Sequence, residues 1–243
     1  GNFVSWNWKA NGAGSANTAG SINSTVSVNT TSGFSIVSYT GNGTGSSTVG
    51  HGLGVAPAYV IIKNTSSTDA WQVFPTGATR LVLNSTASDY GNNGITKGAN
   101  TITLPSGVDN AWNTNGQTYI MYCFTDVQGF SKMGSYTGNG NANGTFVYTG
   151  FKPAFFLIKN TDDGTDDWHI MDNKREGYNP QNDILQPNLS DAEGSSTRVD
   201  FLSNGVKINS SSAFINGSGE KIIYMAFAEA PLVGTNNVPC TAR

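Results

Sequence analysis

Charged residues are scarce in this chain. Only 12% of its 243 residues are Asp, Glu, Lys or Arg, about half the usual share, and the formal net charge is -3. Because there is no basic excess, the chain lacks the attraction on which phosphate binding depends, so we expect no nucleic-acid partner. Gly, Ser, Thr and Asn are abundant instead, and these residues favour turns and strands over helices.

Cysteine and histidine are also rare, with two of each, and they form no zinc-binding pattern. Cys123 alternates with apolar residues in "TYIMYCFTDV" and is expected to pack as a small apolar side chain. Cys240 lies close to the end of the chain. We interpret the two as unrelated thiols, and a disulfide between them stays open.

Long hydrophobic runs are missing as well. No apolar stretch reaches the length of about 18 residues that a transmembrane helix needs, so we expect no membrane insertion. The opening "GNFVSWNWKA" lacks the basic and apolar regions of a signal peptide and has no initiator Met. We expect the chain to be a processed or excised piece of something longer.

A long internal repeat is the strongest positive feature. "APAYVIIKNT" (56–65) returns as "KPAFFLIKNT" (152–161), both copies contain "SYTGNG" upstream, and Trp71 answers Trp168 downstream. A spacing of about 96 residues is the size of a small domain, so the pattern indicates two duplicated units. The apolar run in each copy is expected to be a core strand, and Asn64 and Asn160 are expected to start the loop that follows it.

The units are predicted to be all-β. Runs such as "FSIVSY", "AYVIIKN" and "KIIYMAF" are rich in β-branched and aromatic residues, and "TGNG" or "GNNG" marks tight turns between them. No segment has a sustained 3.6-residue apolar period. Short strands with frequent turn signals predict two tandem antiparallel β-sandwich units of the jelly-roll kind.

The repeat also predicts the domain organisation. We assign 34–128 to the first sandwich repeat and 129–243 to the second. Residues 1–33 are interpreted as a fragment of a closing strand followed by a linker that adds an edge strand. The opening segment resembles the closing strand of each unit, with Trp8 in the place of Phe124, and it could complete the first repeat or belong to a unit further upstream.

An aspartate-rich stretch follows the second copy of the repeat. Asp162, Asp163 and Asp166 could form a calcium site, because clustered carboxylates beside a turn-forming Gly suit a hard cation, although the spacing is not that of an EF-hand. Paired carboxylates of a glycoside hydrolase are a second interpretation. We favour a solvated loop that leads into a strand, with Trp168 buried and His169 on the exposed face, and we expect no cofactor.

No catalytic motif stands out elsewhere, so the chain is not expected to be an enzyme. There is no nucleophile elbow of the form "GxSxG" before a helix, and neither His has the setting of a catalytic triad. His51 aligns with Tyr148 of the other copy, which suggests a shared packing or hydrogen-bonding task.

Aromatic residues in polar surroundings suggest carbohydrate binding. A ring can stack on the apolar face of a sugar while neighbouring amides and carboxylates bind its hydroxyl groups. Trp112 and Tyr178 are the candidate rings, and Asp166 and Asp172 are the candidate polar partners. The alternative for each Trp is a place in the core, which we favour for the repeated pair Trp71 and Trp168.

Several long motifs resemble a known family. "FVSWNWKANG", "GFSIVSYTGNGTGSSTVGHGLGVAPAYVIIKN" and "IIYMAFAEAPLVGTNNVPCTAR" resemble repeated domains of tailed-bacteriophage virion proteins, especially those of marine and cyanobacterial phages. The resemblance covers nearly the whole chain. It implies a lectin-like, concanavalin-type β-sandwich in each unit and a place on the phage particle, and it transfers no catalytic residue.

The expected function is therefore a virion structural or adhesion module. It would be part of a tail fibre or a capsid-attached decoration, assemble with other virion proteins as a homo-oligomer, often threefold, and contact host surface glycans. The variable loop after Asn160 is the expected contact surface. A glycan-degrading depolymerase and a purely architectural spacer are the alternatives.

Overall fold

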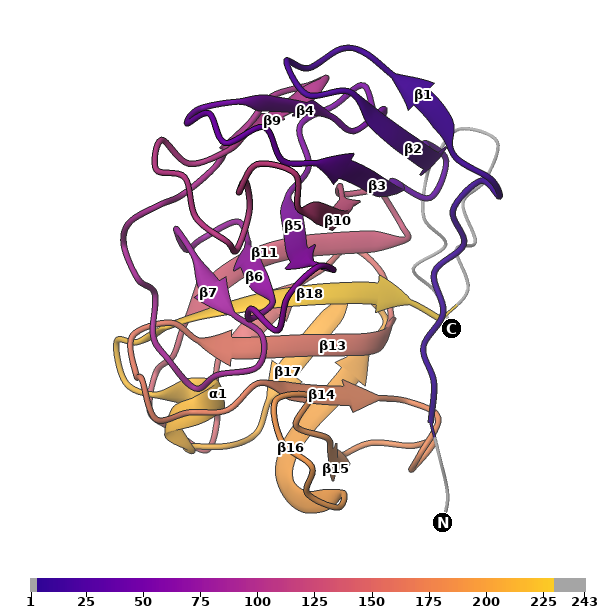
Figure 1. Cartoon of the computed structure of the whole chain (residues 1–243). Helices are drawn as coiled ribbons and strands as arrows, with labels where there is room; N and C mark the ends of the chain where they lie inside the picture. Colours follow the sequence, from indigo (N-terminus) through magenta and orange to yellow (C-terminus); the bar gives the residue numbers. More distant parts are fainter. Residues whose placement is uncertain (1–3, 230–243) are drawn as a thin grey trace. The chain divides into compact units, whose positions relative to one another are not determined.

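The computed structural model describes residues 4–229, apart from the side chains of 196–198 (Figure 1). Nearly all of its regular structure is strand, and the only helix among these residues is the four-residue α1 (Ala213–Asn216). The all-β prediction is confirmed. Within the described range no helix is long and apolar enough to cross a membrane.

The chain forms two compact units. The first comprises the residues up to Asp69 together with Ile95–Thr125, and the second comprises Ala70–Gly94 together with the chain from Asp126. Residues 70–94 belong to the first repeat by sequence and to the second unit in space.

The first unit contains two antiparallel sheets. One has the strand order β1 (Ser15–Asn17), β2 (Ser24–Asn29), β3 (Phe34–Thr40), β10 (Thr118–Phe124) and β5 (Tyr59–Asn64). The other has the order β4 (Thr48–Gly50), β9 (Thr101–Thr103) and β8 (Thr96–Lys97). The prediction that 11–33 adds a strand is confirmed, because β2 pairs with β3.

The opening segment is not a strand in this structure. Residues 4–10 have no regular secondary structure and run beside β2, where Asn29 Nδ2 donates to the Lys9 carbonyl (3.2 Å). Trp8 packs edge-on against Phe124, with 6.0 Å between ring centroids, so it contacts that ring instead of occupying an equivalent position. The similarity of this segment to the closing strands therefore does not extend to strand pairing here.

The second unit also contains two antiparallel sheets and a hairpin. Its first sheet has the order β11 (Ser131–Thr137), β18 (Lys221–Ala228), β13 (Pro153–Asn160) and β14 (His169–Asp172). Its second sheet has the order β12 (Phe146–Tyr148), β17 (Gly205–Ile208), β16 (Gly194–Leu202) and β15 (Gln181–Ile184). The hairpin is formed by β6 (Gln72–Phe74) and β7 (Leu81–Val82).

Both sheets of the second unit contribute to one hydrophobic core. Phe156 and Ile222 come from the first sheet, Val199 and Val206 come from the second, and all four are fully buried. β13 and β18 are nearly continuous apolar runs, and every second residue of each run belongs to this core, because successive side chains point to opposite faces of a sheet. Trp168 is also fully buried, as predicted, and its indole N–H donates to the Val82 carbonyl (3.0 Å). Trp71, for which the sequence also predicts a core position, is only partly buried.

The sequence repeat is a repeat of structure. The order β3, β10, β5 in the first unit is the order β11, β18, β13 in the second. In register, Met121 of β10 lies between Val37 and Ile62, and Met225 of β18 lies between a β11 Met and Leu157. The two copies of "SYTGNG" and of "IKNT" therefore occupy equivalent positions.

The motif "TGNG" is repeated for two backbone reasons. A Cβ on Gly41 would lie 2.3 Å from the Thr114 carbonyl oxygen, and one on Gly138 would lie 2.2 Å from that of Gly217, so both close approaches require Gly. The second Gly of each copy has a positive φ, 68° at Gly43 and 69° at Gly140, as the turn prediction requires.

The Lys of the motif "IKN" forms the same pair of hydrogen bonds in both units. Lys63 Nζ donates to the Asn64 carbonyl (2.7 Å), and Lys159 Nζ donates to the Asn160 carbonyl (2.6 Å). Each Lys also donates to a carbonyl in the loop that follows. Burial lowers the pKa of Lys159 from its ordinary value, while neighbouring aspartates oppose that shift. The Lys thus closes a loop at the end of its strand.

The Asn of the motif is a buried hydrogen-bonding centre. Asn160 is fully buried, and its Nδ2 donates to Asp166 Oδ2 (2.9 Å), Glu220 Oε2 (2.7 Å) and the Ala213 carbonyl (3.2 Å). Its Oδ1 accepts from the Asp162 amide (3.0 Å). The prediction that Asn160 starts the loop is confirmed, and the same side chain also joins that loop to α1 and to the start of β18.

The first unit repeats this arrangement around Asn64. This Asn is also fully buried, and its Nδ2 donates to the Asn110 carbonyl (2.5 Å), to Gln117 Oε1 (2.5 Å) and, at 3.5 Å, to Asp69 Oδ2. The partners of the two centres are equivalent in sequence, so Asp166 corresponds to Asp69.

Candidate functional site

Trp112 is buried, so the structure does not support it as a stacking ring for a sugar. Its side chain is 2% exposed, and its indole N–H donates to the Gly107 carbonyl (2.8 Å). The Tyr39 hydroxyl donates to the Trp112 carbonyl (2.8 Å), as the Tyr136 hydroxyl donates to that of Ile215 (2.7 Å). Trp112 thus occupies a core position of the repeat, which the polar residues around it in the sequence obscured.

Asp166 is part of the Asn160 centre and is not a free carboxylate. Its Oδ2 accepts from Asn160 Nδ2, as Asp69 does in the first unit. Burial raises the pKa of Asp166 from its ordinary value, and the Asn160 hydrogen bond acts in the opposite direction. We therefore assign Asp166 a structural role in place of the predicted sugar contact.

The carboxylates of Asp162 and Asp163 each accept hydrogen bonds from other groups of the protein. Asp162 Oδ2 accepts from the Lys221 amide (2.9 Å), and Asp163 Oδ1 accepts from the Thr165 amide and hydroxyl, each at 2.8 Å. Among the described residues no three Asp, Glu, His or Cys side chains are grouped so that they could hold a metal ion. The geometry of this loop therefore gives the calcium interpretation no support.

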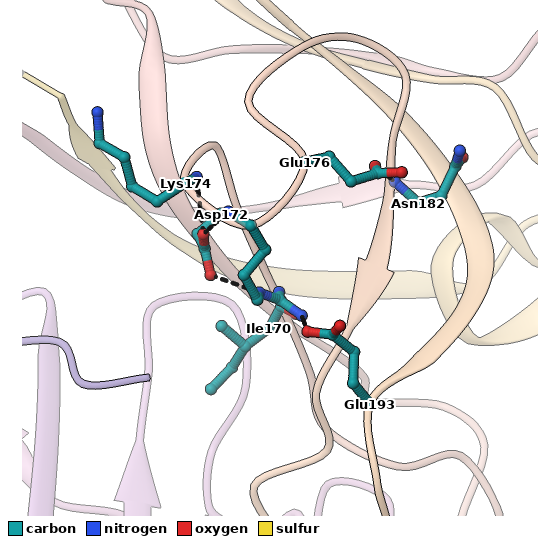
Figure 2. A network of polar contacts seen from close by, with 7 residues as sticks. Ile170, Asp172, Lys174, Glu176, Asn182 and Glu193 are labelled. Atoms are coloured by element: carbon teal, nitrogen blue, oxygen red, sulfur yellow. Dashed lines mark hydrogen bonds and ion pairs between the residues drawn. The ribbon is translucent and has the colours of Figure 1, made fainter. Parts of the chain in front are cut away.

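Asp172 is held in a buried ion pair with Arg175 (Figure 2). Arg175 Nε donates to Asp172 Oδ2 (2.8 Å), its Nη1 donates to Glu193 Oε2 (2.7 Å), and its Nη2 donates to the Ile170 carbonyl (3.1 Å). Asp172 Oδ1 accepts from the Lys174 amide (2.9 Å). With both oxygens engaged and only 4% of the residue exposed, Asp172 is not available to bind a sugar hydroxyl.

Of the four residues predicted to contact a sugar, Tyr178 is the one that lies open to solvent. It is 72% exposed and lies in the loop between β14 and β15, 173–180. This loop leaves the end of β14 opposite to the aspartate-rich loop. Strands rise about 3.3 Å per residue, so the length of β13 separates the two loops by about 20 Å. The structure therefore does not bring Asp166 and Tyr178 together.

A polar pocket of about 440 Å³ opens beside Tyr178. It lies where β13 begins and where β14 and β18 end, and β16 contributes Phe201 to its wall. Its lining is formed by Lys152, Asn173, Lys174, Gly177, Tyr178, Asn179, Gln181, Phe201 and Glu229. All of these residues belong to the second unit.

Two buried amide oxygens in the pocket lining lack a donor. Asn173 is 9% exposed and Gln181 is 3% exposed, and neither Asn173 Oδ1 nor Gln181 Oε1 has a hydrogen-bond partner within the described part of the chain. Their nitrogen ends are held, because Asn173 Nδ2 donates to Glu229 Oε2 (2.9 Å) and Gln181 Nε2 donates to the Tyr178 carbonyl (2.7 Å). A buried acceptor without a partner is costly, so a ligand with O–H or N–H groups would be stabilised here.

The loop that carries Tyr178 is pinned at both ends. Asn179 bridges to β16, since its Nδ2 donates to the Phe201 carbonyl (3.1 Å) and its Oδ1 accepts from the Phe201 amide (2.9 Å). The Asn182 amide donates to the Glu176 carboxylate, also shown in Figure 2. The exposed ring is therefore presented by a braced loop, which reduces the entropy lost when a ligand binds.

The pocket carries two lysines and one carboxylate. Lys174 Nζ lies 2.5 Å from Glu229 Oε1, and this pairing lowers the pKa of Glu229 from its ordinary value. Glu229 is therefore a charged, paired acceptor near neutral pH and not a proton donor. Lys152 forms no ion pair with a described residue, so the lining has a net positive charge.

The predictions for the two histidines need correction. His169 is not on an exposed face: it is 4% exposed and stacks on Phe214, with 4.1 Å between ring centroids. His51 is buried, and its Nδ1 accepts a hydrogen bond from the Leu53 amide (3.3 Å). In the second unit, Thr149 Oγ1 likewise accepts from the backbone amide two residues further on (3.4 Å). The counterpart of His51 is thus Thr149, and Tyr148 is 65% exposed. The predicted hydrogen-bonding task is present at the neighbouring position.

Acid should destabilise the second unit through His169. Burial lowers the pKa of His169 from 6.5 to about 4, so protonation favours the unfolded state. The contribution of neutral His169 to the free energy of unfolding is fully present above the unfolded-state pKa of 6.5. It is lost as the pH falls from 6.5 towards 4, by about 3 kcal/mol in total. Urea unfolding at several pH values, for the wild type and for His169→Gln, measures this loss.

Gln is the matched replacement because Gln72 occupies the equivalent buried position in the first repeat. Aspartates and glutamates titrate in the same range, so the quantity to compare is the difference between the two proteins. We expect the wild type to lose more stability than His169→Gln below pH 6.5. Parallel stability curves would show that His169 does not titrate as its burial implies.

Most of the pocket residues were not identified from the sequence. Lys152, Asn173, Gln181 and Glu229 come from separate segments, and only strand pairing brings them together. A signal was available, however, because the loop 173–180 differs in length and composition from its first-repeat counterpart 75–80. The copies diverge there as clearly as they do in the aspartate-rich loop.

These features define an all-β protein of two structurally repeated units, with a braced polar pocket in the second. Residues 1–231 match the family described as "Domain of unknown function (DUF7483)", and the chain belongs to that family. Neither the comparison with curated proteins nor the comparison with solved structures gives a match.

Proposed function

We propose that this chain is a structural and adhesion module of a tailed-bacteriophage particle that binds host surface glycans through the pocket beside Tyr178. The single observation that carries glycan binding is an exposed aromatic ring next to buried amide oxygens without donors. A sugar offers both complements, since its C–H face stacks on a ring and its hydroxyls donate hydrogen bonds.

The place on the particle is supported by the resemblance of the repeat motifs to phage virion proteins. Each unit would be a lectin-like jelly roll of the concanavalin type, and two packed sheets with one core in the second unit agree with that proposal. A surface with few charges also lets identical subunits pack without repulsion, as a threefold fibre or a capsid decoration with other virion proteins requires. Antibody against the chain should label purified particles, and unlabelled particles would refute this assignment.

A depolymerase is not favoured. Glycoside hydrolysis uses two carboxylates across a cleft, one of them a proton donor. The pocket lining contributes one carboxylate, Glu229, which is paired with Lys174, and Asp172 is paired with Arg175. We therefore propose a binding function without catalysis.

Replacing Tyr178 by Ala should weaken glycan binding about tenfold, because it removes the stacking surface and leaves the fold intact. A glycan array with the full chain identifies a ligand, and titration calorimetry measures the affinities of the variants. The matched control is Tyr148→Ala, which removes another exposed tyrosine of the second unit outside the pocket.

Equal losses in the two variants, or none in either, would show that the pocket is not the binding site. Absence of binding to any glycan by the wild type would favour the spacer function over adhesion.

A further inference from the structure

The hydrogen-bonding groups and charges of the pocket beside Tyr178 restrict the class of ligand that it can bind. Its lining includes two residues whose amide oxygens, Asn173 Oδ1 and Gln181 Oε1, are buried and have no partner within residues 4–229. Carbonyl oxygens accept hydrogen bonds and donate none, so a ligand group that bonds to them must carry O–H or N–H. A bare phosphate or a simple carboxylate without hydroxyls does not meet this requirement.

The remaining charge in the lining is positive. The Glu229 carboxylate accepts from Lys174 Nζ through one oxygen and from Asn173 Nδ2 through the other. Lys152 is exposed and helps to lower the pKa of Glu229, but it forms no ion pair with any described residue, so it is the cation of the lining that a ligand can bind. It directly precedes Pro153 at the start of β13, a backbone position fixed by the sheet.

Apolar surface completes the site. Tyr178 presents an exposed ring, and Phe201 forms a buried part of the wall. A pyranose ring has an apolar face and a rim of hydroxyls, and it matches a ring surface on one side and acceptors on the other. The positive charge of Lys152 would be paired by a negative group on the same sugar.

We propose that the pocket selects a sugar unit bearing a carboxylate, such as a uronic acid. In this arrangement Lys152 binds the carboxylate, Asn173 Oδ1 and Gln181 Oε1 accept from ring hydroxyls, and Tyr178 stacks on the sugar face. This inference rests on the proposed glycan-binding function and adds the class of sugar to it.

The test compares an acidic oligosaccharide with its methyl ester, because the ester keeps the ring and its hydroxyls and removes the charge. Oligogalacturonate and its methyl ester are suitable probes for calorimetry with the full chain. The wild type should bind the acid about tenfold more tightly than the ester, as expected for one charge-assisted hydrogen bond.

Variants at Lys152 assign that preference to the pocket. Lys152→Gln should bind acid and ester equally, and Lys152→Arg should restore the preference. Lys132→Gln is the control, because Lys132 is another lysine of the second unit that lies outside the pocket, partly exposed and paired with Asp126. Since neither lysine is buried, each variant should fold as the wild type does.

The outcomes distinguish failure of the selection for acidic sugars from failure of the proposed glycan-binding function. Equal binding of acid and ester by the wild type, or a preference that persists in Lys152→Gln, overturns the selection of acidic sugars. Binding only to neutral glycans on the array also overturns it while leaving glycan binding in place. Absence of binding to every glycan overturns the proposed function itself.

Discussion

Replacing Asn160 by Leu should lower the free energy of unfolding of the second unit by about 4 kcal/mol. The variant removes hydrogen bonds from the fully buried Asn160 to the carboxylates of Asp166 and Glu220, and leaves these partly buried groups without that donor. Hydrogen bonds to charged groups contribute about 1.5–3 kcal/mol each, and an unsatisfied partner adds to the loss. Urea unfolding followed by circular dichroism measures the change.

The repeat supplies an internal comparison for this experiment. Asn64→Leu makes the same change in the first unit, where Nδ2 donates to neutral partners at Asn110 and Gln117 and only distantly to Asp69, so the loss should be smaller. Asn143→Leu, at an exposed position of the second unit, should change stability by less than about 0.5 kcal/mol. A loss below about 1 kcal/mol for Asn160→Leu would show that the centre is not a main stabilising element.

Replacing Arg175 by Met should cost about 3–5 kcal/mol, because Asp172 would remain as a buried carboxylate without its cation. The Ile170 carbonyl and Glu193 would also lose a donor. Thermal and urea unfolding measure the loss.

A second substitution tests this explanation. The double variant Arg175→Met with Asp172→Asn should recover much of the stability, since it removes the uncompensated charge. Lys132→Met, which breaks the exposed ion pair with Asp126, is the matched control and should have an effect within about 0.5 kcal/mol. If the double variant were as unstable as the single one, the buried charge would not be the cause of the loss.

Both predictions concern polar residues that stabilise the fold, as distinct from those that line the proposed binding pocket. Asp166 and Asp172 are the acidic residues that the sequence pattern suggests for sugar contacts, and both are bonded within the protein. The buried side-chain atoms without a partner in residues 4–229 include the amide oxygens of Asn173 and Gln181 in the pocket lining, which no motif distinguishes. These amides together with the exposed ring of Tyr178, and not the carboxylates, mark the candidate site.

The sequence by itself determines the strands, the turns and the duplication. Runs of β-branched and aromatic residues and the placement of Gly and Asn act over a few neighbouring residues, so the strand at 153–160 and the turn at Gly140 can be predicted without the fold. The two copies of "IKNT" predict equivalent units, because they belong to a long repeat that also includes "SYTGNG".

Only the tertiary structure decides which polar and aromatic side chains are free. Burial and hydrogen-bond pairing depend on residues distant in sequence, as when the Tyr39 hydroxyl donates to the Trp112 carbonyl or when Phe214 stacks on His169. For the same reason the pocket is invisible in the sequence. Lys152, Glu229 and the Tyr178 loop become neighbours only because β13 lies between β14 and β18 in the sheet.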